Sequence, residues 1–572
     1  MFSYILFNLN FFLNKKLKLK LLFLFVLHFV NTLLDIISVA SIPAFLIFFF
    51  NKNQIQVEIN YINDILNYVL NIIDKSPATL IFSFFALFFI AKTLLSLIYY
   101  IYFVKFGYEL DIDISKKIVR KKLETSYLNY VQSTYSSFLN LTTNIINDFV
   151  QSNFLVLFQI IVNLVTILTF FIFLVLINPL TTISIVILAI IGFVFYYLIT
   201  KKKFIFYGKH KIILYEKILS QIKDIYYAFK EIKIYGKEDS FIDNFITKKR
   251  AWALNKIKFQ IISNLPKIFL ELILVLIVIA IFFLSNKFNL KLEAILINIT
   301  IFVVSAQRLF PRFMAILRNY SKLNYSNKAQ KILVSELEKE IPQNQKKTPI
   351  IFKNKIYLKN VNFGYSYEKT ILDNVNLEIQ KGSFIGIKGN SGEGKSTLLN
   401  LIMGLLEPSS GNIFIDNINI NKNIKGYMGL IGYIPQKISI LNDTIKNNLV
   451  FANDQFEIVD NDLINILDVV KLNDLIRDNR KGLNTIISDA TFKASEGEIQ
   501  RFGIARALFQ KKEIFILDEI TSSLDEKNER NIMNIVHGLK GSSTIIVISH
   551  KNSVLEFCDQ VYTVHNKKLS NL

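Results

Sequence analysis

Residues 389–396 read GNSGEGKS, a complete G-x-x-x-x-G-K-[ST] run, and this stretch decides the fold of the C-terminal part of the chain. A phosphate-binding loop of this kind requires a buried strand that leads into a glycine-rich turn, and the turn must open a helix. Residues 383–388 (SFIGIK) have the composition of such a strand, and residues 397–406 (TLLNLIMGLL) are apolar at helical spacing. The sequence therefore predicts a strand, a phosphate loop and a helix in this order.

The chemistry of the loop follows from its residue types. Glycines let backbone N–H groups close around phosphate oxygens, and the helix N-terminus adds a partial positive charge. Lys395 supplies a full positive charge, and the hydroxyl of Ser396 is placed to ligate Mg²⁺. We predict that ATP with Mg²⁺ is bound by the whole run, which consists of Gly389, Asn390, Ser391, Gly392, Glu393, Gly394, Lys395 and Ser396.

The N-terminal part of the chain has the composition of a membrane domain. Of the 572 residues 52% are hydrophobic and the mean hydropathy is +0.38, far above the usual values for a soluble enzyme. Several windows of about 20 residues or more carry few charges and are long enough to cross a hydrocarbon core of about 30 Å. We predict six membrane spans, near residues 21–50, 78–104, 152–178, 180–199, 263–285 and 293–317.

The charge of the chain is strongly positive, with 66 Lys and Arg residues against 45 Asp and Glu residues. Much of the basic excess flanks the predicted spans, at 15–20 and over 201–258, which argues against nucleic acid as a partner. For a multi-pass membrane protein, the positive-inside rule places the N-terminus, the segments 105–150 and 201–258 and the C-terminal domain in the cytoplasm. Cys558, the single cysteine, excludes an intrachain disulfide and fits a reducing compartment.

Three regions follow from these patterns: a transmembrane domain over 1–325, a charged linker over 326–349 and an α/β domain over 350–572. In the last region short β-rich runs alternate with helical ones, which predicts a largely parallel sheet. The long polar stretches between the predicted spans are almost free of proline, so we expect the membrane helices to continue beyond the bilayer. An apolar stripe within 51–77 suits a short helix on the outer surface, and an ordinary loop is the alternative.

Hydrolysis of ATP needs further groups: a second ligand for Mg²⁺, a residue that orients water and one that contacts the γ-phosphate. The apolar run 514–517 ends in Asp518 and Glu519, of which the first suits the metal and the second suits a general base. His550 follows another apolar run, and Gln436 ends a third. We predict that Ser396, Gln436 and Asp518 surround the metal and that Glu519 and His550 are catalytic.

In this order the motifs resemble the ATP-binding cassette (ABC) transporter family, in the form of an exporter half-transporter. The resemblance implies an all-α six-helix transmembrane domain of the type I exporter kind, followed by an α/β P-loop nucleotide-binding domain. It also implies roles by position: an adenine-stacking Tyr365, a phosphate loop that extends to Thr397, a Q-loop at Gln436, a signature at Ser495, Glu496, Gly497 and Glu498, a D-loop with Ser523 and Asp525, and a switch histidine at His550.

The signature departs from the family pattern. The usual Leu-Ser-Gly-Gly-Gln is here ASEGE over residues 494–498, so Glu496 brings a carboxylate toward nucleotide phosphates. In the family this segment closes over the nucleotide of the opposite subunit, which implies an obligate dimer. Either Glu496 points away and the chain forms a homodimer, or it pairs with a partner that carries the usual signature. We favour the homodimer because closed twofold assemblies are the commonest.

The transported substrate is predicted from ionisable residues within the spans, which are costly there and therefore informative. If Lys92, Lys267 and Arg308 face one cavity, they form a basic lining suited to a phosphate or pyrophosphate headgroup. The alternative is neutralisation, of Lys267 by Glu271 and of another cation by Asp35, or snorkelling at span ends.

The residues around these positions resemble the lipid-linked oligosaccharide flippases of bacterial protein N-glycosylation, although a further basic position of that group is Ala315 here. In that group a short external helix joins the first two spans, as residues 55–73 would. The resemblance implies ATP-driven flipping of a polyprenyl-pyrophosphate glycan in contact with membrane lipid. The alternatives are an exporter of lipids, peptides or hydrophobic drugs, one half of a heterodimeric exporter, and, from another class, a non-transporting membrane-tethered ATPase or regulator.

Overall fold

The structure, a computed structural model, divides the chain into two compact units: Met1–Glu124 with Ser133–Glu340, and Thr125–Gln132 with Ile341–Leu572. The described residues are 8, 10–50, 77–177, 179–287, 292–339, 348–366, 369–451, 459–477, 481–488, 494–521 and 524–571. The predicted external helix at 55–73 lies outside this part of the chain.

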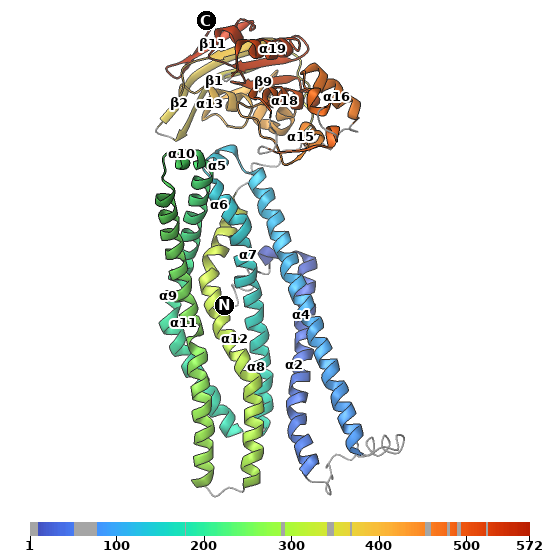
Figure 1. Cartoon of the computed structure of the whole chain (residues 1–572), viewed down its shortest axis with the longest axis vertical. Helices are drawn as coiled ribbons and strands as arrows, with labels where there is room; N and C mark the ends of the chain where they lie inside the picture. The colour runs from blue at the N-terminus through green and yellow to red at the C-terminus, as the bar shows by residue number, and fades with distance from the viewer. Residues whose placement is uncertain are drawn as a thin grey trace. The chain divides into compact units, whose positions relative to one another are not determined.

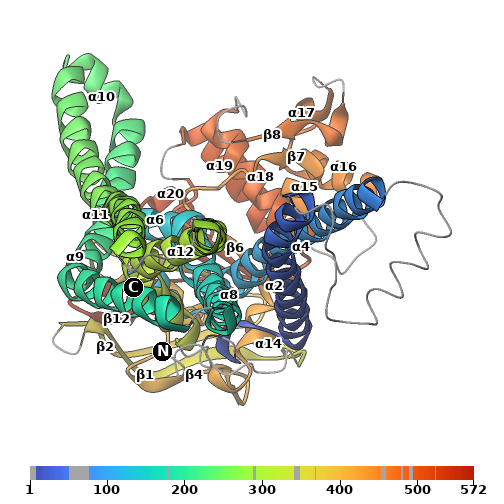
Figure 2. The same cartoon turned by 90° about the horizontal axis from the view of Figure 1, so that it is seen from below.

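The first unit is a bundle of long helices, in which α2 lies beside α4 and α9 lies beside α11 (Figures 1 and 2). Its elements are α2 Lys15–Phe50, α4 Pro77–Glu124, α6 Tyr135–Asn140, α7 Ile146–Phe149, α8 Leu155–Ile177, α9 Pro179–Tyr227, α10 Phe229–Ile234, α11 Glu238–Lys287 and α12 Leu292–Glu338. Two π-helical turns, Leu141–Ile145 and Val150–Phe154, join α6, α7 and α8 into one continuous helical run.

The helix lengths confirm that these helices extend beyond the apolar windows. α4 has 48 residues, which at 1.5 Å per residue is roughly 70 Å and well beyond a hydrocarbon core of about 30 Å. Within the described residues, three stretches are long and apolar enough to cross a membrane: Lys15–Ser38, Ser83–Glu124 and Tyr135–Leu176. The other three predicted spans fall on α9, α11 and α12, where many side chains lie outside the described part.

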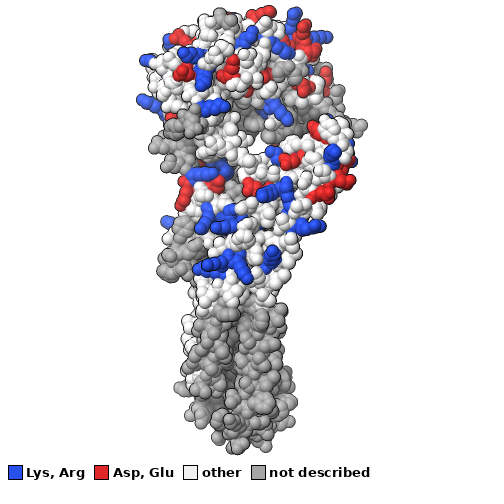
Figure 3. Space-filling view, turned by 90° about the vertical axis from the view of Figure 1, so that its left-hand side faces the viewer, with Lys and Arg blue, Asp and Glu red and all other residues white. Residues whose placement is uncertain are grey.

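Charged side chains mark the polar part of this unit. Lys201, Lys202 and Lys203 are exposed directly after the apolar part of α9, and Figure 3 shows basic side chains gathered on the side of the unit that carries α9 and α11. Apolar residues instead fill the space where α4, the α6–α8 run and α12 meet. Phe12 and Phe149 are fully buried there, with ring centroids 4.3 Å apart. In this part of the unit, apolar side chains are therefore buried and basic side chains are exposed.

The second unit is an α/β domain. Its elements are α5 Tyr127–Val131, β1 Lys355–Ser366, β2 Lys369–Gln380, β3 Phe384–Lys388, α13 Lys395–Ile402, β4 Ser410–Ile415, β5 Ile418–Asn419, α14 Ile424–Met428, β6 Ile431–Ile434, β7 Asp443–Thr444, α15 Ile445–Val450, α16 Asp460–Val469, α17 Asp474–Arg477, β8 Ile486–Ile487, α18 Glu496–Phe509, β9 Ile514–Asp518, α19 Glu526–His537, β10 Thr544–Ile548, α20 Asn552–Leu555, β11 Gln560–His565 and β12 Lys568–Asn571.

The main sheet confirms the predicted parallel arrangement. Its order is β12-β11-β3-β10-β9-β6, and only the edge strand β12 pairs antiparallel. β3, β9 and β10 are buried on both faces, which explains their unbroken apolar sequences. The predicted strands β1 and β4 belong instead to a separate antiparallel sheet of order β2-β1-β4-β5. A short apolar run does not show which sheet a strand will join.

The two units differ from the predicted domain boundaries at two places. α12 continues to Glu338, so the first part of the predicted linker at 326–349 is helix, because Ala329 and Leu333 are buried in the helical core. The segment Thr125–Gln132 groups with the second unit although α4 and α6 flank it in sequence. Its helix α5 packs through Tyr127 and Leu128 against the core of the α/β domain.

Gly208 allows a close approach of two long helices in the first unit. A Cβ atom at this position of α9 would lie 2.1 Å from the backbone oxygen of Tyr325 in α12. Because a backbone atom cannot move without its helix, we expect Gly208→Ala to lower the melting temperature of the detergent-purified protein by several degrees.

Gly107→Ala is the matched control, since the added Cβ would meet only the flexible side-chain tip of Leu155 at 2.8 Å. Equal melting temperatures for both variants would show that the α9–α12 approach tolerates a methyl group.

Candidate functional site

The phosphate loop connects β3 to α13, as predicted. Gly394 caps α13 with φ 100°, a conformation that residues with a Cβ rarely adopt. Gly389 has φ 156°, and a Cβ there would lie 2.6 Å from the carbonyl oxygen of Val564. These glycines let the backbone turn tightly at the end of a buried strand, so that its N–H groups surround the space in front of the helix.

Lys395 is the buried cation of the loop, with an exposed fraction of 6%. Its ammonium group donates hydrogen bonds to the carbonyl oxygens of Gly389 and Asn390, both at 2.8 Å. These bonds hold the positive charge inside the curve of the loop, where phosphate oxygens bind in loops of this type. The next residue, Ser396, is exposed in the first turn of α13 and can present its hydroxyl to a metal.

Tyr365 lies next to this loop. Its hydroxyl is 3.4 Å from the hydroxyl of Thr397, and its ring packs edge-on against Phe363. The ring is 43% exposed. An exposed aromatic face beside a phosphate loop agrees with the predicted stacking of an adenine base.

Glu393 has a role that the sequence did not indicate. Its carboxylate accepts hydrogen bonds from the backbone N–H of Asn390 at 2.7 Å and from the Asn390 side chain at 3.2 Å, and it lies 3.0 Å from Nδ1 of His565. The hydrogen bond from the Asn390 backbone and the contact with His565 lower the pKa of this carboxyl. Glu393 is thus an internal brace of the loop, and its negative charge is directed toward β11.

The two catalytic candidates, Glu519 and His550, meet the metal candidate Gln436 at the ends of neighbouring strands. Glu519 follows β9 directly and has φ 49°, a strained backbone conformation that is common at functional sites. One of its carboxylate oxygens accepts a hydrogen bond from Gln436 at 3.3 Å, and the other lies 3.2 Å from Nε2 of His550. Because β6, β9 and β10 are adjacent and parallel, the residues that follow them reach the same point.

Asp518 fits the role of a metal ligand. Burial raises the pKa of its carboxyl, with Glu519 adding to this shift, while the hydroxyl of Tyr433 and the charge of Lys395 oppose it. A desolvated carboxylate of this kind is stabilised by a nearby cation. With the Ser396 hydroxyl and the Gln436 amide it offers hard oxygen donors, and Mg²⁺ takes one or two carboxylates together with phosphate oxygens and water. The donor set therefore fits Mg²⁺.

The altered signature begins α18. Ser495 is its N-cap, and it forms a capping box in which the Ser495 backbone N–H and hydroxyl donate to the Glu498 carboxylate at 2.7 and 2.8 Å. The backbone bond lowers the pKa of Glu498. Glu496 is exposed and Gly497 is buried. The helix is thus well capped, but two carboxylates occupy its first turn.

The D-loop candidates are only partly described. Asp525 is the N-cap residue of α19 and accepts a hydrogen bond from Asn528 at 2.6 Å. Ser523 lies outside the described residues.

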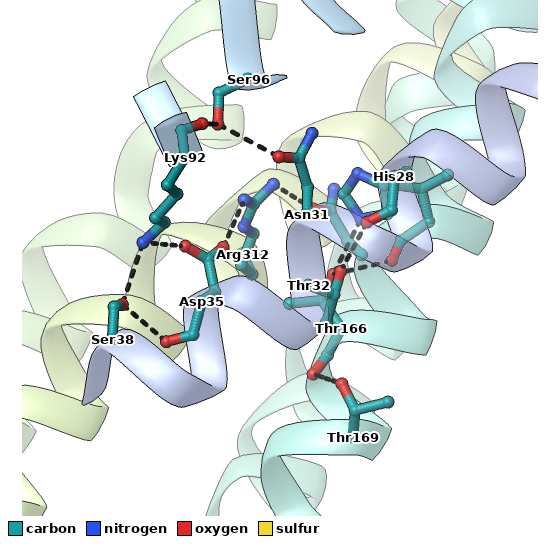
Figure 4. Close-up of polar contacts among 12 residues, drawn as sticks. His28, Asn31, Thr32, Asp35, Ser38, Lys92, Ser96, Thr166, Thr169 and Arg312 are labelled. Atoms are coloured by element: carbon teal, nitrogen blue, oxygen red, sulfur yellow. Dashed lines mark hydrogen bonds and ion pairs between the residues drawn. The ribbon is translucent and has the colours of Figure 1, made fainter. Parts of the chain in front are cut away.

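A second candidate site lies in the helical unit, around Asp35 (Figure 4). The ammonium group of Lys92 is 2.6 Å from this carboxylate and donates to the hydroxyl of Ser38 at 2.9 Å, while the guanidinium of Arg312 is 3.7 Å away. Lys92 is thus neutralised by Asp35, which is the alternative that the sequence left open. Two cations share one anion, so the group as a whole carries an excess positive charge.

Arg312 is the more available of the two cations. Its side chain is 38% exposed, against 9% for Lys92, and its contact with Asn163 is long, at 3.4 Å. The other two predicted basic residues, Lys267 and Arg308, lie on α11 and α12, and their side chains are outside the described part.

One cavity adjoins this group. It has a volume of about 470 Å³ and is lined by Asp35 and Arg312 together with aromatic side chains such as Tyr99 and Phe170. A second cavity, of about 440 Å³, has a mostly polar lining that includes Arg318 and Lys322. Gln159 and Ala315 line both, so the cavities are neighbours along α12. Apolar walls with a few polar groups, as in the first cavity, are typical of ligand sites.

Comparison with known families gives two matches. Residues 372–522 match the family model described as ABC transporter, and residues 21–310 match the model described as ABC transporter transmembrane region. The second model alone spans half of the chain.

Individual proteins are similar over part or all of the chain. A probable ABC transporter ATP-binding/permease protein of Haemophilus influenzae is 38% identical over 221 residues, 38% of this chain and 39% of its own length. An ATP-dependent lipid A-core flippase of Wigglesworthia glossinidia brevipalpis is 29% identical over 59% of each chain. The chain thus spans less than two thirds of these relatives. The structure of a bacterial Atm1-family ABC exporter with ATP bound matches with a TM-score of 0.79 at 19% identity, covering 97% of this chain and 94% of the other, which shows a shared exporter fold.

Glu519 can be tested by replacement with glutamine. Glu519→Gln preserves the size of the side chain but removes the basic carboxylate, so we expect ATP binding to persist while turnover falls by about 100-fold or more. Binding is measured with radiolabelled ATP, and turnover by phosphate release.

Glu513→Gln at the other end of β9 is the control, because Glu513 forms a surface ion pair with Lys381. Continued hydrolysis in the Glu519 variant would exclude this residue as the base.

Proposed function

The chain belongs to the ABC transporter family, and we propose that it hydrolyses ATP with Mg²⁺ in order to export or flip an amphipathic substrate across the bacterial inner membrane. The observation that carries this proposal is the meeting of the phosphate loop, Asp518 and the Gln436–Glu519–His550 group in one domain. Binding, metal and base functions are then available at one place, as hydrolysis requires.

Each side chain has a distinct part in the proposed reaction. Lys395 and the loop N–H groups bind the phosphates. Asp518 would bind Mg²⁺, which would neutralise phosphate charge. Glu519 accepts a proton from the attacking water. Gln436 and His550 fix the orientation of this carboxylate through its two oxygens. The strained backbone of Glu519 supports this role, because strain is retained where a position matters for chemistry.

We propose that the working form is an obligate dimer, with a homodimer favoured over a heterodimer. Half-transporters complete each nucleotide site with the signature of a second subunit, and closed twofold symmetry is the simplest arrangement. Exposure of Glu496 at the start of α18 leaves its carboxylate room to turn away from a nucleotide. The basic residues after the apolar part of α9 support a cytoplasmic location for the ATP-binding domain.

We propose a lipid-linked oligosaccharide on a polyprenyl pyrophosphate as the substrate. The support is the charge of the helical unit: Arg312, Arg318 and Lys322 line adjoining cavities in which Asp35 is the one acidic lining residue among those described. A guanidinium group binds phosphate oxygens in bidentate fashion, and the aromatic walls suit an apolar chain. Similarity to proteins named ATP-dependent lipid A-core flippases supports a lipid as the substrate.

The dimer proposal can be tested with the purified chain alone. We expect it to form a dimer by light scattering and to hydrolyse ATP, and we expect Glu496→Gly to change the rate by less than about twofold if the carboxylate points away from the nucleotide.

Glu526→Gly is the matched control, since it removes an exposed acid from the first turn of α19. An inactive chain that gains activity through Glu496→Gly would favour the heterodimer, in which the partner supplies the usual signature.

The substrate proposal can be tested by ATPase stimulation in nanodiscs. We expect polyprenyl-pyrophosphate-linked glycan to raise the rate and hydrophobic drugs to leave it unchanged, and we expect Arg312→Gln to weaken the response several-fold because a phosphate partner is lost. Lys203→Gln, an exposed cation outside the cavities, is the control.

In cells, deletion of the gene should stop surface glycan from appearing while the lipid-linked precursor persists. Unchanged surface glycan would contradict this substrate, and stimulation by drugs alone would favour a drug or lipid exporter.

A further inference from the structure

Tyr433 occupies an unusual position beside the carboxylate of Asp518. It lies on β6, one residue before the end of the sheet pairing, and its Cα partner in β9 is Ile516. Side chains alternate along a strand, so Ile516 and Asp518 point to the same face of the sheet. Tyr433 faces the same side, and its hydroxyl reaches Asp518 Oδ2 at 3.3 Å.

The hydroxyl of Tyr433 is the donor of this hydrogen bond, and the carboxylate of Asp518 is the acceptor. The other charged groups that act on Asp518 are Glu519 and Lys395. Tyr433 is therefore the neutral group that orients this carboxylate.

We infer that Tyr433 is a positioning residue, which holds the Asp518 carboxylate in the orientation needed for the metal of the bound nucleotide. The inference rests on the proposed hydrolysis of Mg²⁺-ATP and adds a residue to its site. Asp518 would contribute to metal binding, and Tyr433 would act only through Asp518. The 42% exposure of Tyr433 favours this role over a purely structural one, because the ring is not part of the buried core.

The test measures the binding of Mn²⁺ in the absence of turnover. Mn²⁺ binding to the full-length protein with a non-hydrolysable ATP analogue is followed by electron paramagnetic resonance. We expect Tyr433→Phe to raise the Mn²⁺ dissociation constant by about three- to tenfold, because one hydrogen bond to a charged group is lost. Affinity for the analogue in EDTA should stay unchanged. Tyr357→Phe, on β1 with its ring stacked on Phe414, is the control.

The results separate this inference from the proposed function. Unchanged Mn²⁺ affinity in Tyr433→Phe would overturn the positioning role, and so would an equal loss of affinity in EDTA, which indicates general damage. If the unmodified protein neither binds nor hydrolyses the nucleotide, the proposed function itself fails.

Discussion

The parallel pairing of β3, β10, β9 and β6 is the constraint on which the second unit depends. Parallel strands in register end at one edge, and each of the four is followed here by a chemically active segment. The phosphate loop follows β3, His550 follows β10, the acidic pair ends β9 and Gln436 follows β6. Gln436 and Glu519, 83 positions apart in sequence, are thus brought within hydrogen-bonding distance, and His550 reaches the same carboxylate.

Electrostatics organise the helical unit in a comparable way. A buried charge is tolerated only when it is paired, and Asp35 serves two cations from two other helices. Lys92 takes the closer place, so Arg312 is held more loosely and remains beside the cavity. His28, Thr32 and Thr166 form a neighbouring set of hydrogen bonds, at 3.0 and 3.3 Å, which joins α2 to α8 (Figure 4). Polar contacts therefore connect several helices around the cavities proposed to bind the substrate.

Much of the arrangement of the candidate nucleotide site was predictable from sequence because its residues follow strands and carry recognisable spacing. The glycines of the loop, Asp518, Glu519 and Gln436 all fall in such places. Glu393 and Tyr433 were not recognisable as bracing or positioning residues, because their partners His565 and Asp518 are distant in sequence and only the sheet order makes them neighbours. The pairing of Lys92 with Asp35 depends likewise on the packing of α2 against α4, which hydropathy does not specify.

The brace between Glu393 and His565 has a consequence for handling the protein. His565 ends β11, whose antiparallel hairpin with β12 forms the edge of the main sheet. The phosphate loop is therefore supported in part by a hairpin at the edge of the sheet. Truncation of this hairpin would release the Glu393 carboxylate without altering Lys395 or Ser396, so a preparation damaged there would bind nucleotide less well while its helical unit stayed intact.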